Sequence, residues 1–426
     1  MIDDINSLLV TLCPLLFLPF MTWWRAQNTL DKCVTASLAI WCVGATFTRH
    51  LAIQSFCLFA LFAFISACKN HYFKIHTKWY YLLFVYFIWH AISLLWMPEF
   101  LIGLKHLRIY TLFVFIPLIF SCINLNKTQL NGILVVFARV IMLYTIISLL
   151  FWVYKSYQLN VPLSEWIIIS KKLIAGSNVY DIVYSWCNYY HPTYNGIVIC
   201  MALAVSFYKT SSSLKESHIH YLETLFFIFS SLLLIIITQS RMSLVLWGIT
   251  CFCGIGYLLR NYKLKYLYYL TVIICAFLAT HFGEDRIVTF IKDKQRVQNI
   301  KTAFYFIEQH PVLGSGIEGI RAEMADHEVA KKLGYPYANV DLGNPHHQFI
   351  GDLMQTGIVG LLLIIAIMST LAYNVVKQRS WILGMFWIIS FILMQIEMPF
   401  YLHKGVVFFC LFACLLSFDN TKKITE

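Results

Sequence analysis

Two adjacent histidines, His346 and His347, are the residues of this chain best suited to acid–base chemistry. They follow Asn344 and Pro345, and asparagine before proline is typical of the cap and first position of a helix. We therefore expect both histidines in the first turn of a helix, where unpaired backbone N–H groups and the helix dipole favour the neutral imidazole. A neutral imidazole near pH 7 can act as a general base, and the same helix end attracts phosphate oxygens.

The histidine pair has two other interpretations. One is a solvated pair on the surface, and the other is a zinc site with ligands from Asp341, His327 or Asp352, whose spacing suits zinc poorly. The thirteen cysteines lie almost entirely in apolar runs, as small hydrophobic residues do, and no pair of them has zinc-ligand spacing. The sequence therefore predicts neither a metal nor another cofactor.

Arg241 is the second candidate for chemistry. It follows Thr238-Gln239-Ser240 and begins the apolar run 242–259, where an arginine at the bilayer centre would cost ~3 kcal/mol. Its guanidinium either reaches the membrane interface or faces the helix bundle and binds an anion through two parallel hydrogen bonds. Arg296, near the start of another predicted helix, is either a second anion ligand or a solvated charge.

Four further residues are candidate substrate ligands. His347 is the first, and Arg108 and Arg139 lie near or inside apolar runs, where an arginine is either functional or part of an ion pair whose partner the sequence does not identify. His191 precedes Pro192 at the end of a polar loop; it lines a substrate cavity or simply ends the loop.

Composition defines the elements that must position these residues. With 59% hydrophobic and 12% charged residues, the chain is predicted to be an all-α polytopic membrane protein. The net charge of +11 comes from lysines and arginines in short loops, which is typical of orientation signals at the cytoplasmic face rather than of nucleic-acid binding. The first 24 residues have an acidic start and lack a small-residue cleavage site, so we expect them to remain as a span.

The apolar runs predict thirteen spans. If the basic loops all lie on the cytoplasmic side, a single transmembrane domain (1–426) has two long outer segments, an outer loop at 155–193 and a large outer loop at 283–350. Twelve spans are the alternative, because Pro14 and Pro19 interrupt the first run. The predicted spans are 8–24, 33–47, 51–67, 79–96, 110–123, 132–154, 194–208, 222–238, 242–259, 267–281, 353–373, 381–398 and 406–418.

The large outer loop has helical patterning of its own. Apolar residues recur at helical spacing through 295–309, which predicts an amphipathic helix that lies on the membrane surface or on the bundle. A turn at 313–316 and a charged helix at 317–333 follow. The helix that begins at Asn344 is expected to run directly into the span from Leu353. The recurring apolar residues are Val297, Ile300, Phe304 and Ile307.

The order of these motifs resembles the O-antigen ligase and polymerase superfamily. The resemblance covers roughly 190–360, and the number of spans and the large penultimate outer loop agree with it. Three sequence features carry it: Thr238-Gln239-Ser240-Arg241-Met242-Ser243 at the start of a span; Arg296 before Glu308-Gln309-His310-Pro311-Val312-Leu313-Gly314-Ser315-Gly316; and His346-His347-Gln348-Phe349-Ile350 with Gly357 beyond it.

The resemblance implies a membrane glycosyltransferase of the GT-C type with a helical periplasmic cap, inverting and metal-independent, in the bacterial inner membrane. Its donor would be a glycan on undecaprenyl diphosphate. The acceptor would be a hydroxyl of lipid A-core in a ligase, a lipid-linked glycan in a polymerase, or a protein. His346 matches the family's essential histidine, and Arg241 and Arg296 match its essential arginines. Many relatives have asparagine where this chain has His347, and the family usually has twelve spans. A glycan or lipid transporter is the competing class.

Overall fold

The computed structural model describes residues 29–97, 99–158, 192–212, 218–238, 240–260, 266, 268, 294–317, 319, 327–333 and 344–420. Throughout these residues every regular element is a helix. The chain divides into two compact units, the first made of three separate stretches of sequence and the second of two. The predicted all-α class is therefore confirmed.

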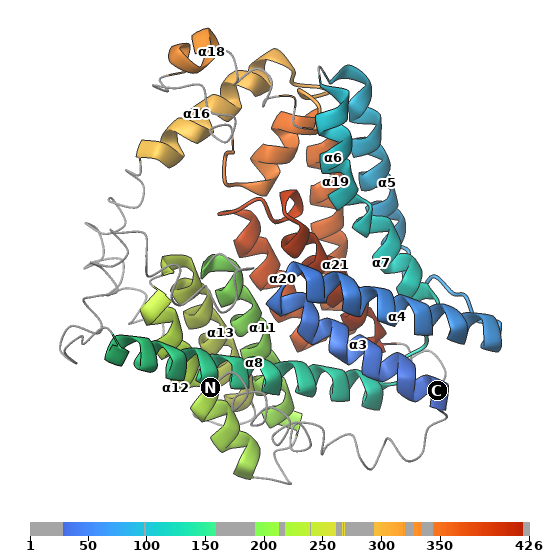
Figure 1. Ribbon diagram of the computed structural model, residues 1–426, viewed down its shortest axis with the longest axis vertical. Helices are drawn as coiled ribbons and strands as arrows, with labels where there is room; N and C mark the ends of the chain where they lie inside the picture. The colour runs from blue at the N-terminus through green and yellow to red at the C-terminus, as the bar shows by residue number, and fades with distance from the viewer. Residues whose placement is uncertain are drawn as a thin grey trace. The chain divides into compact units, whose positions relative to one another are not determined.

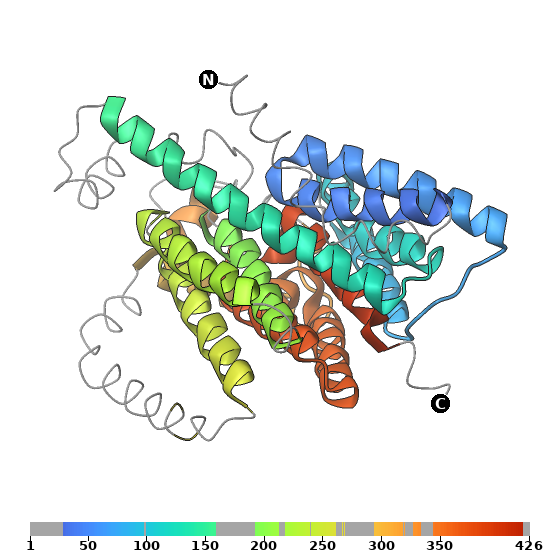
Figure 2. The same ribbon diagram turned by 90° about the horizontal axis from the view of Figure 1, so that it is seen from below.

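The first unit comprises residues 1–74, 119–258 and 415–426. Thr48 separates the first two described helices of this unit, and its Oγ1 accepts a hydrogen bond at 3.1 Å from the N–H of Leu51, which caps the second of them. These two helices lie side by side (Figure 1), and the long helix α8 packs along α11 and α12 (Figure 2). The helices are α3 (Thr29–Phe47), α4 (Arg49–Asn70), α8 (Lys127–Gln158), α11 (Pro192–Ser212), α12 (His218–Thr238), α13 (Arg241–Leu259) and the short η6 (Ser417–Asn420).

The second unit comprises residues 75–118 and 259–414. Its central element is α19 (Gln348–Gln378), against which α5, α16 and α20 pack. The other helices are α5 (Tyr80–Ile92), η2 (Ser93–Trp96), α6 (Phe100–Tyr110), α7 (Leu112–Ser121, which ends just beyond the unit), α16 (Lys294–Gln309), α18 (His327–Lys332), α20 (Trp381–Met394), η5 (Pro399–Tyr401) and α21 (His403–Leu416).

The described helices have the length and the surface of membrane spans. Seven of them are long and apolar enough to cross a bilayer. A soluble protein would not leave a continuous apolar stripe exposed along a helix, but α12 does so at helical spacing, through Leu222, Phe226, Phe229, Leu233 and Ile236. The polytopic membrane class is thus confirmed. The predicted spans 8–24 and 267–281 lie outside the described residues, apart from residue 268, and the number of spans and their orientation remain predictions.

Helix α19 differs from the prediction in two ways. It begins at Gln348 rather than at Asn344, and it is interrupted at Gly357, whose φ of 67° and ψ of −164° are not helical. The segment 311–316 forms hydrogen bonds with the backbone N–H and C=O groups of α19 that lose their helical partners at the interruption. Three hydrogen bonds do this: Ser315 N–H to Met354 C=O at 3.1 Å, Gly316 N–H to Gln355 C=O at 2.8 Å, and Ile358 N–H to Pro311 C=O at 3.1 Å.

Glycine is required where these two segments meet. A Cβ atom on Gly357 would lie 2.0 Å from the carbonyl oxygen of Val312, and its positive φ also disfavours other residues. The predicted turn at 313–316 is confirmed, with φ of 69° at Gly314 and 84° at Gly316. The helix that follows the histidines is therefore a short segment, 348–356, joined to the rest of α19 through the hydrogen bonds of segment 311–316.

The amphipathic helix predicted for 295–309 is confirmed as α16, but only part of the predicted apolar face packs: Ile307 lies against the core, and other residues complete the contact. Ala303 and Phe306 are fully buried and form a core with Met354 of α19. Val297 and Phe304, predicted to form the apolar face, are 40% and 48% exposed. The charged helix predicted for 317–333 is described mainly over α18, and residues 334–343 lie outside the described part of the chain.

Candidate active site

His346 occupies a tight turn just before α19. Its φ of 48° is left-handed, a conformation that histidine adopts more readily than most residues. The turn is held because the N–H of His346 donates to Oδ1 of Asn344 at 2.8 Å. In turn, the carbonyl of Asn344 accepts from Nδ2 of the buried Asn299 on α16 at 2.9 Å. Helix α16 thus fixes the backbone of the histidine.

His347, not Asn344, is the N-cap of α19. Its backbone is extended, and its Nδ1 accepts a weak hydrogen bond at 3.4 Å from the N–H of Ile350. Burial lowers the pKa of His347, and a hydrogen bond with Gln395 opposes this shift in part. The sequence-based expectation that Asn344 caps the helix, with both histidines in its first turn, was wrong. The capping role requires a neutral His347 imidazole.

The imidazole of His346 faces a carboxylate. Its Nδ1 lies 3.2 Å from Oε2 of Glu397, and 37% of the histidine side chain and 13% of the glutamate side chain are exposed. Because an ionised carboxylate only accepts hydrogen bonds, Nδ1 of a neutral His346 carries the proton and Nε2 carries the lone pair. Glu397 follows α20, and its N–H donates to the carbonyl of Leu393 at 2.9 Å. A carboxylate thus orients the imidazole ring of His346.

Lys404, near the start of α21, adds a positive charge beside this pair. It precedes the span predicted from residue 406. Burial lowers the pKa of Lys404 to about 8, and the charge of Glu397 opposes the shift. The lysine is therefore largely protonated at neutral pH and keeps its positive charge beside the pair.

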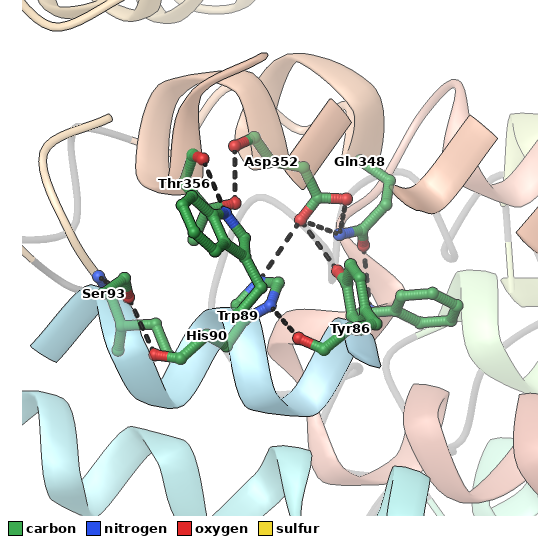
Figure 3. A network of polar contacts seen from close by, with 9 residues as sticks. Tyr86, Trp89, His90, Ser93, Gln348, Asp352 and Thr356 are labelled. Carbon is green, nitrogen blue, oxygen red and sulfur yellow. Dashed lines mark hydrogen bonds and ion pairs between the residues drawn. The ribbon is translucent and has the colours of Figure 1, made fainter. Parts of the chain in front are cut away.

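A buried polar network supports the start of α19 from α5 (Figure 3). Asp352 is 1% exposed, and its Oδ1 accepts from the hydroxyl of Tyr86 at 2.8 Å. Both of its oxygens lie 3.2 Å from Nε2 of Gln348, and Nε2 of the fully buried His90 lies 3.7 Å from Oδ1. One turn further on, Nε1 of Trp89 donates to the carbonyl of Thr356 at 2.9 Å. These contacts hold the short helix in place.

Arg241 lies at the exposed start of α13 in the first unit, whereas His346 belongs to the second. Ser240 precedes the helix, and its Oγ accepts from the N–H of Ser243 at 3.3 Å, so the serines of the motif cap the helix that begins with the arginine. A Cβ atom on Gly196 of α11 would lie 2.0 Å from Oγ of Ser243, which shows how closely α11 approaches this turn.

The remaining candidates are found in different surroundings. Arg139 pairs with Glu223 at 2.8 Å, beside a pocket also lined by Lys209 and His220, which identifies the partner that the sequence did not. Arg108 is exposed on α6. Arg296 lies in α16, but its side chain is outside the described part of the structure, and so is His191 as a whole.

Sequence reasoning missed Glu397, Lys404 and Gln348. One signal for Glu397 was available, because it is the only acidic residue between Asp352 and Asp419. An ionisable residue in so apolar a stretch is a candidate functional residue by default. Gln348 gave no such signal, since a glutamine at the start of a helix is common.

The described structure thus defines a polytopic helical membrane protein that holds a histidine–carboxylate pair at the start of an interrupted helix. Residues 225–365 match the family model of the O-antigen ligases. This match covers about a third of the chain and supports its resemblance to the O-antigen ligase and polymerase superfamily, whose members are membrane glycosyltransferase-like enzymes. Arg241, Arg296 and His346 all lie inside the matched segment. No curated protein sequence matches the chain significantly.

Proposed function

We propose that the protein is an O-antigen ligase, which transfers a glycan from undecaprenyl diphosphate to a hydroxyl of lipid A-core at the periplasmic face of the bacterial inner membrane. The family match to residues 225–365 supports the class of reaction. The observation that carries the assignment of the site is the 3.2 Å contact between Nδ1 of the half-exposed His346 and Glu397. A base needs this combination of an oriented ring and access to substrate.

In the proposed reaction, the acceptor hydroxyl oxygen attacks the anomeric carbon of the donor sugar from the face opposite the diphosphate. The new glycosidic bond forms as the bond between the anomeric carbon and the diphosphate oxygen breaks, and the diphosphate departs with the electron pair. The hydroxyl proton passes to Nε2 of His346. Glu397 stabilises the imidazolium that results, as a carboxylate does in a catalytic triad. Inversion at the anomeric carbon follows from the single displacement.

The departing diphosphate carries negative charge that must be neutralised. From the resemblance, we assign this role to the guanidinium groups of Arg241 and Arg296, which bind phosphate oxygens through paired hydrogen bonds without a metal.

The test is transfer by membranes or purified protein supplied with an undecaprenyl-diphosphate-linked glycan and lipid A-core. His346→Ala and Arg241→Ala should abolish transfer while the protein remains inserted at normal abundance. Full activity of both variants would refute the proposal. EDTA should have no effect, and loss of activity with EDTA would instead indicate a metal-dependent reaction. A transporter would give no covalent product in this assay.

The acceptor is tested in a deletion strain. For a ligase, the lipopolysaccharide of that strain should be core without attached repeats. Core that carries a single repeat would instead identify a repeat-unit polymerase of the same superfamily.

A further inference from the structure

We propose that Gln348 is a positioning residue for glycan transfer: its side-chain amide joins α19 to the loop after α20 and so fixes Glu397 opposite His346. This inference rests on the proposed role of His346 as the base. Gln348 is the first residue of α19 and is fully buried, so its hydrogen bonds are made within the protein rather than with water.

The amide of Gln348 makes contacts at both ends. Its Nε2 donates to the two oxygens of Asp352 at 3.2 Å each, and its Oε1 accepts from the N–H of Phe400 at 2.9 Å. The direction of the bridge follows from chemistry, because a carboxylate accepts hydrogen bonds and a backbone N–H donates one. Only one orientation of the amide satisfies both neighbours, so the bridge selects a single geometry.

Asp352, the residue that accepts from Nε2 of Gln348, is itself held by other contacts. Asp352 is held by the hydroxyl of Tyr86 at 2.8 Å, and Figure 3 shows its carboxylate between Tyr86 and Gln348. Tyr86 belongs to α5 and is fully buried. The amide of Gln348 therefore projects from a fixed support, which a positioning residue requires.

Phe400, the residue that donates to Oε1 of Gln348, belongs to the loop that carries Glu397. Phe400 lies three residues after Glu397, and its fully buried ring packs on Phe113 and Phe409 at centroid distances of 4.8 Å. Met398, which lies between Glu397 and Phe400 in the sequence, packs closely over Gly351 of α19. A Cβ atom on Gly351 would lie 2.3 Å from Cε of Met398. The last turn of α20 holds the other end of the loop, through the N–H of Glu397. Gln348 thus supplies the polar contact that fixes the position of this loop along the axis of α19.

Loss of the bridge should affect catalysis rather than substrate binding. Gln348→Met keeps the length and volume of the side chain but removes three hydrogen bonds, so the loop can shift and Glu397 can leave Nδ1 of His346. We expect kcat to fall about tenfold with KM changed less than about twofold, since one charge-assisted hydrogen bond is weakened in the transition state.

The decisive measurement is a double-mutant cycle in the full-length protein, with kcat and KM for transfer from the undecaprenyl-diphosphate donor. If Gln348 acts through Glu397, Gln348→Met should lower kcat about tenfold in the wild-type background and less than about twofold in the Glu397→Gln background. Gln355→Met is the matched control. Gln355 is also buried on α19, and its Oε1 has no hydrogen-bond partner among the described residues, so this variant should keep kcat within about twofold.

Each outcome decides the question. Equal fold-losses in the two backgrounds, or wild-type kcat in Gln348→Met, overturn the positioning role while leaving the proposed function intact. Activity of His346→Ala overturns the proposed function itself. If Gln348→Met does not yield folded protein, Gln348→Asn replaces it, because its amide is one methylene too short to reach both partners. Failure of both variants to fold would mean that the bridge serves folding, and would overturn the inference.

Discussion

Replacing Glu397 by glutamine is the sharpest test of the histidine–carboxylate pair. The substitution keeps the size of the side chain and removes its charge. The glutamine oxygen can still accept from Nδ1 of His346, but the neutral amide no longer stabilises an imidazolium. If the amide instead turns its NH₂ group to Nδ1, the imidazole adopts the other tautomer, and Nε2 no longer has a lone pair for the acceptor proton.

The expected size of the effect follows from the geometry. At 3.2 Å, the contact is a hydrogen bond between charged partners once the imidazolium forms. Such bonds contribute about 1.5–3 kcal/mol, and each 1.36 kcal/mol is a factor of ten in rate, so kcat should fall about 10- to 100-fold. Because 37% of the histidine side chain is exposed and water screens the charges, we expect the lower half of this range. Removing the base itself should cost more, about 10²- to 10⁴-fold.

The assay is steady-state transfer from a radiolabelled undecaprenyl-diphosphate glycan to lipid A-core, with protein amounts matched by immunoblot. Glu308→Gln on α16 is the control for a change of charge, because Glu308 is exposed, and it should stay within about twofold of wild type. Our reasoning would be refuted if Glu397→Gln retained wild-type kcat while His346→Ala was inactive. In that case the carboxylate would not orient the base.

Four further predictions follow from other features. His347→Asn, which keeps a good N-cap, should retain transfer activity, whereas the matched His346→Asn variant should lose it about 10²- to 10⁴-fold in the same assay. Burial lowers the pKa of His347 below its value of about 6.5 in the unfolded chain, so between these two pKa values the unfolded state binds more protons. The stability of the folded protein should therefore fall as pH drops below about 6.5. The melting temperature in detergent should fall less on acidification in the His347→Asn variant than in wild type. Gly357→Ala should destabilise the protein by at least about 1–3 kcal/mol, because its φ is positive and its Cβ would meet the carbonyl of Val312; a melting temperature equal to that of wild type would contradict this account of the interruption. Arg139→Gln should leave transfer unchanged and lower stability by no more than about 1 kcal/mol, since its ion pair is partly exposed; loss of transfer in folded protein would show a functional role instead.

Much of the fold could be predicted from the sequence because hydrophobic runs and helical periodicity are local signals. The membrane class, the positions within a few residues of most helices from α3 to α13, the helix α16 and the turn at 313–316 all follow from such patterns, whereas α6 was not predicted. His346 and Arg241 could be singled out because each combines an unusual residue type with a helix boundary. Their participation in one reaction remains a proposal.

The rest depends on contacts between residues far apart in the chain. Asn344-Pro345 has the composition of a helix start, but the side chain of Asn344 is used to hold the left-handed turn at His346, and the cap passes to His347. Nothing local distinguishes these two uses of an asparagine. The interruption at Gly357 was missed for the same reason, because it is stable only when another segment supplies the missing hydrogen bonds. The partner of His346 lies 51 residues away, so its role was visible only in the folded chain.

The interruption of α19 also bears on how substrates can reach His346. Segment 311–316 supplies two N–H donors and one acceptor to α19, so lifting it away would leave the carbonyls of Met354 and Gln355 and the N–H of Ile358 unpaired. Each of these three hydrogen bonds contributes about 0.5–1.5 kcal/mol, so we expect the turn to stay in place during turnover. The turn is then a fixed part of the structure beside α19. We therefore expect both the lipid-linked donor and the acceptor to enter along routes that leave the turn at 311–316 in place.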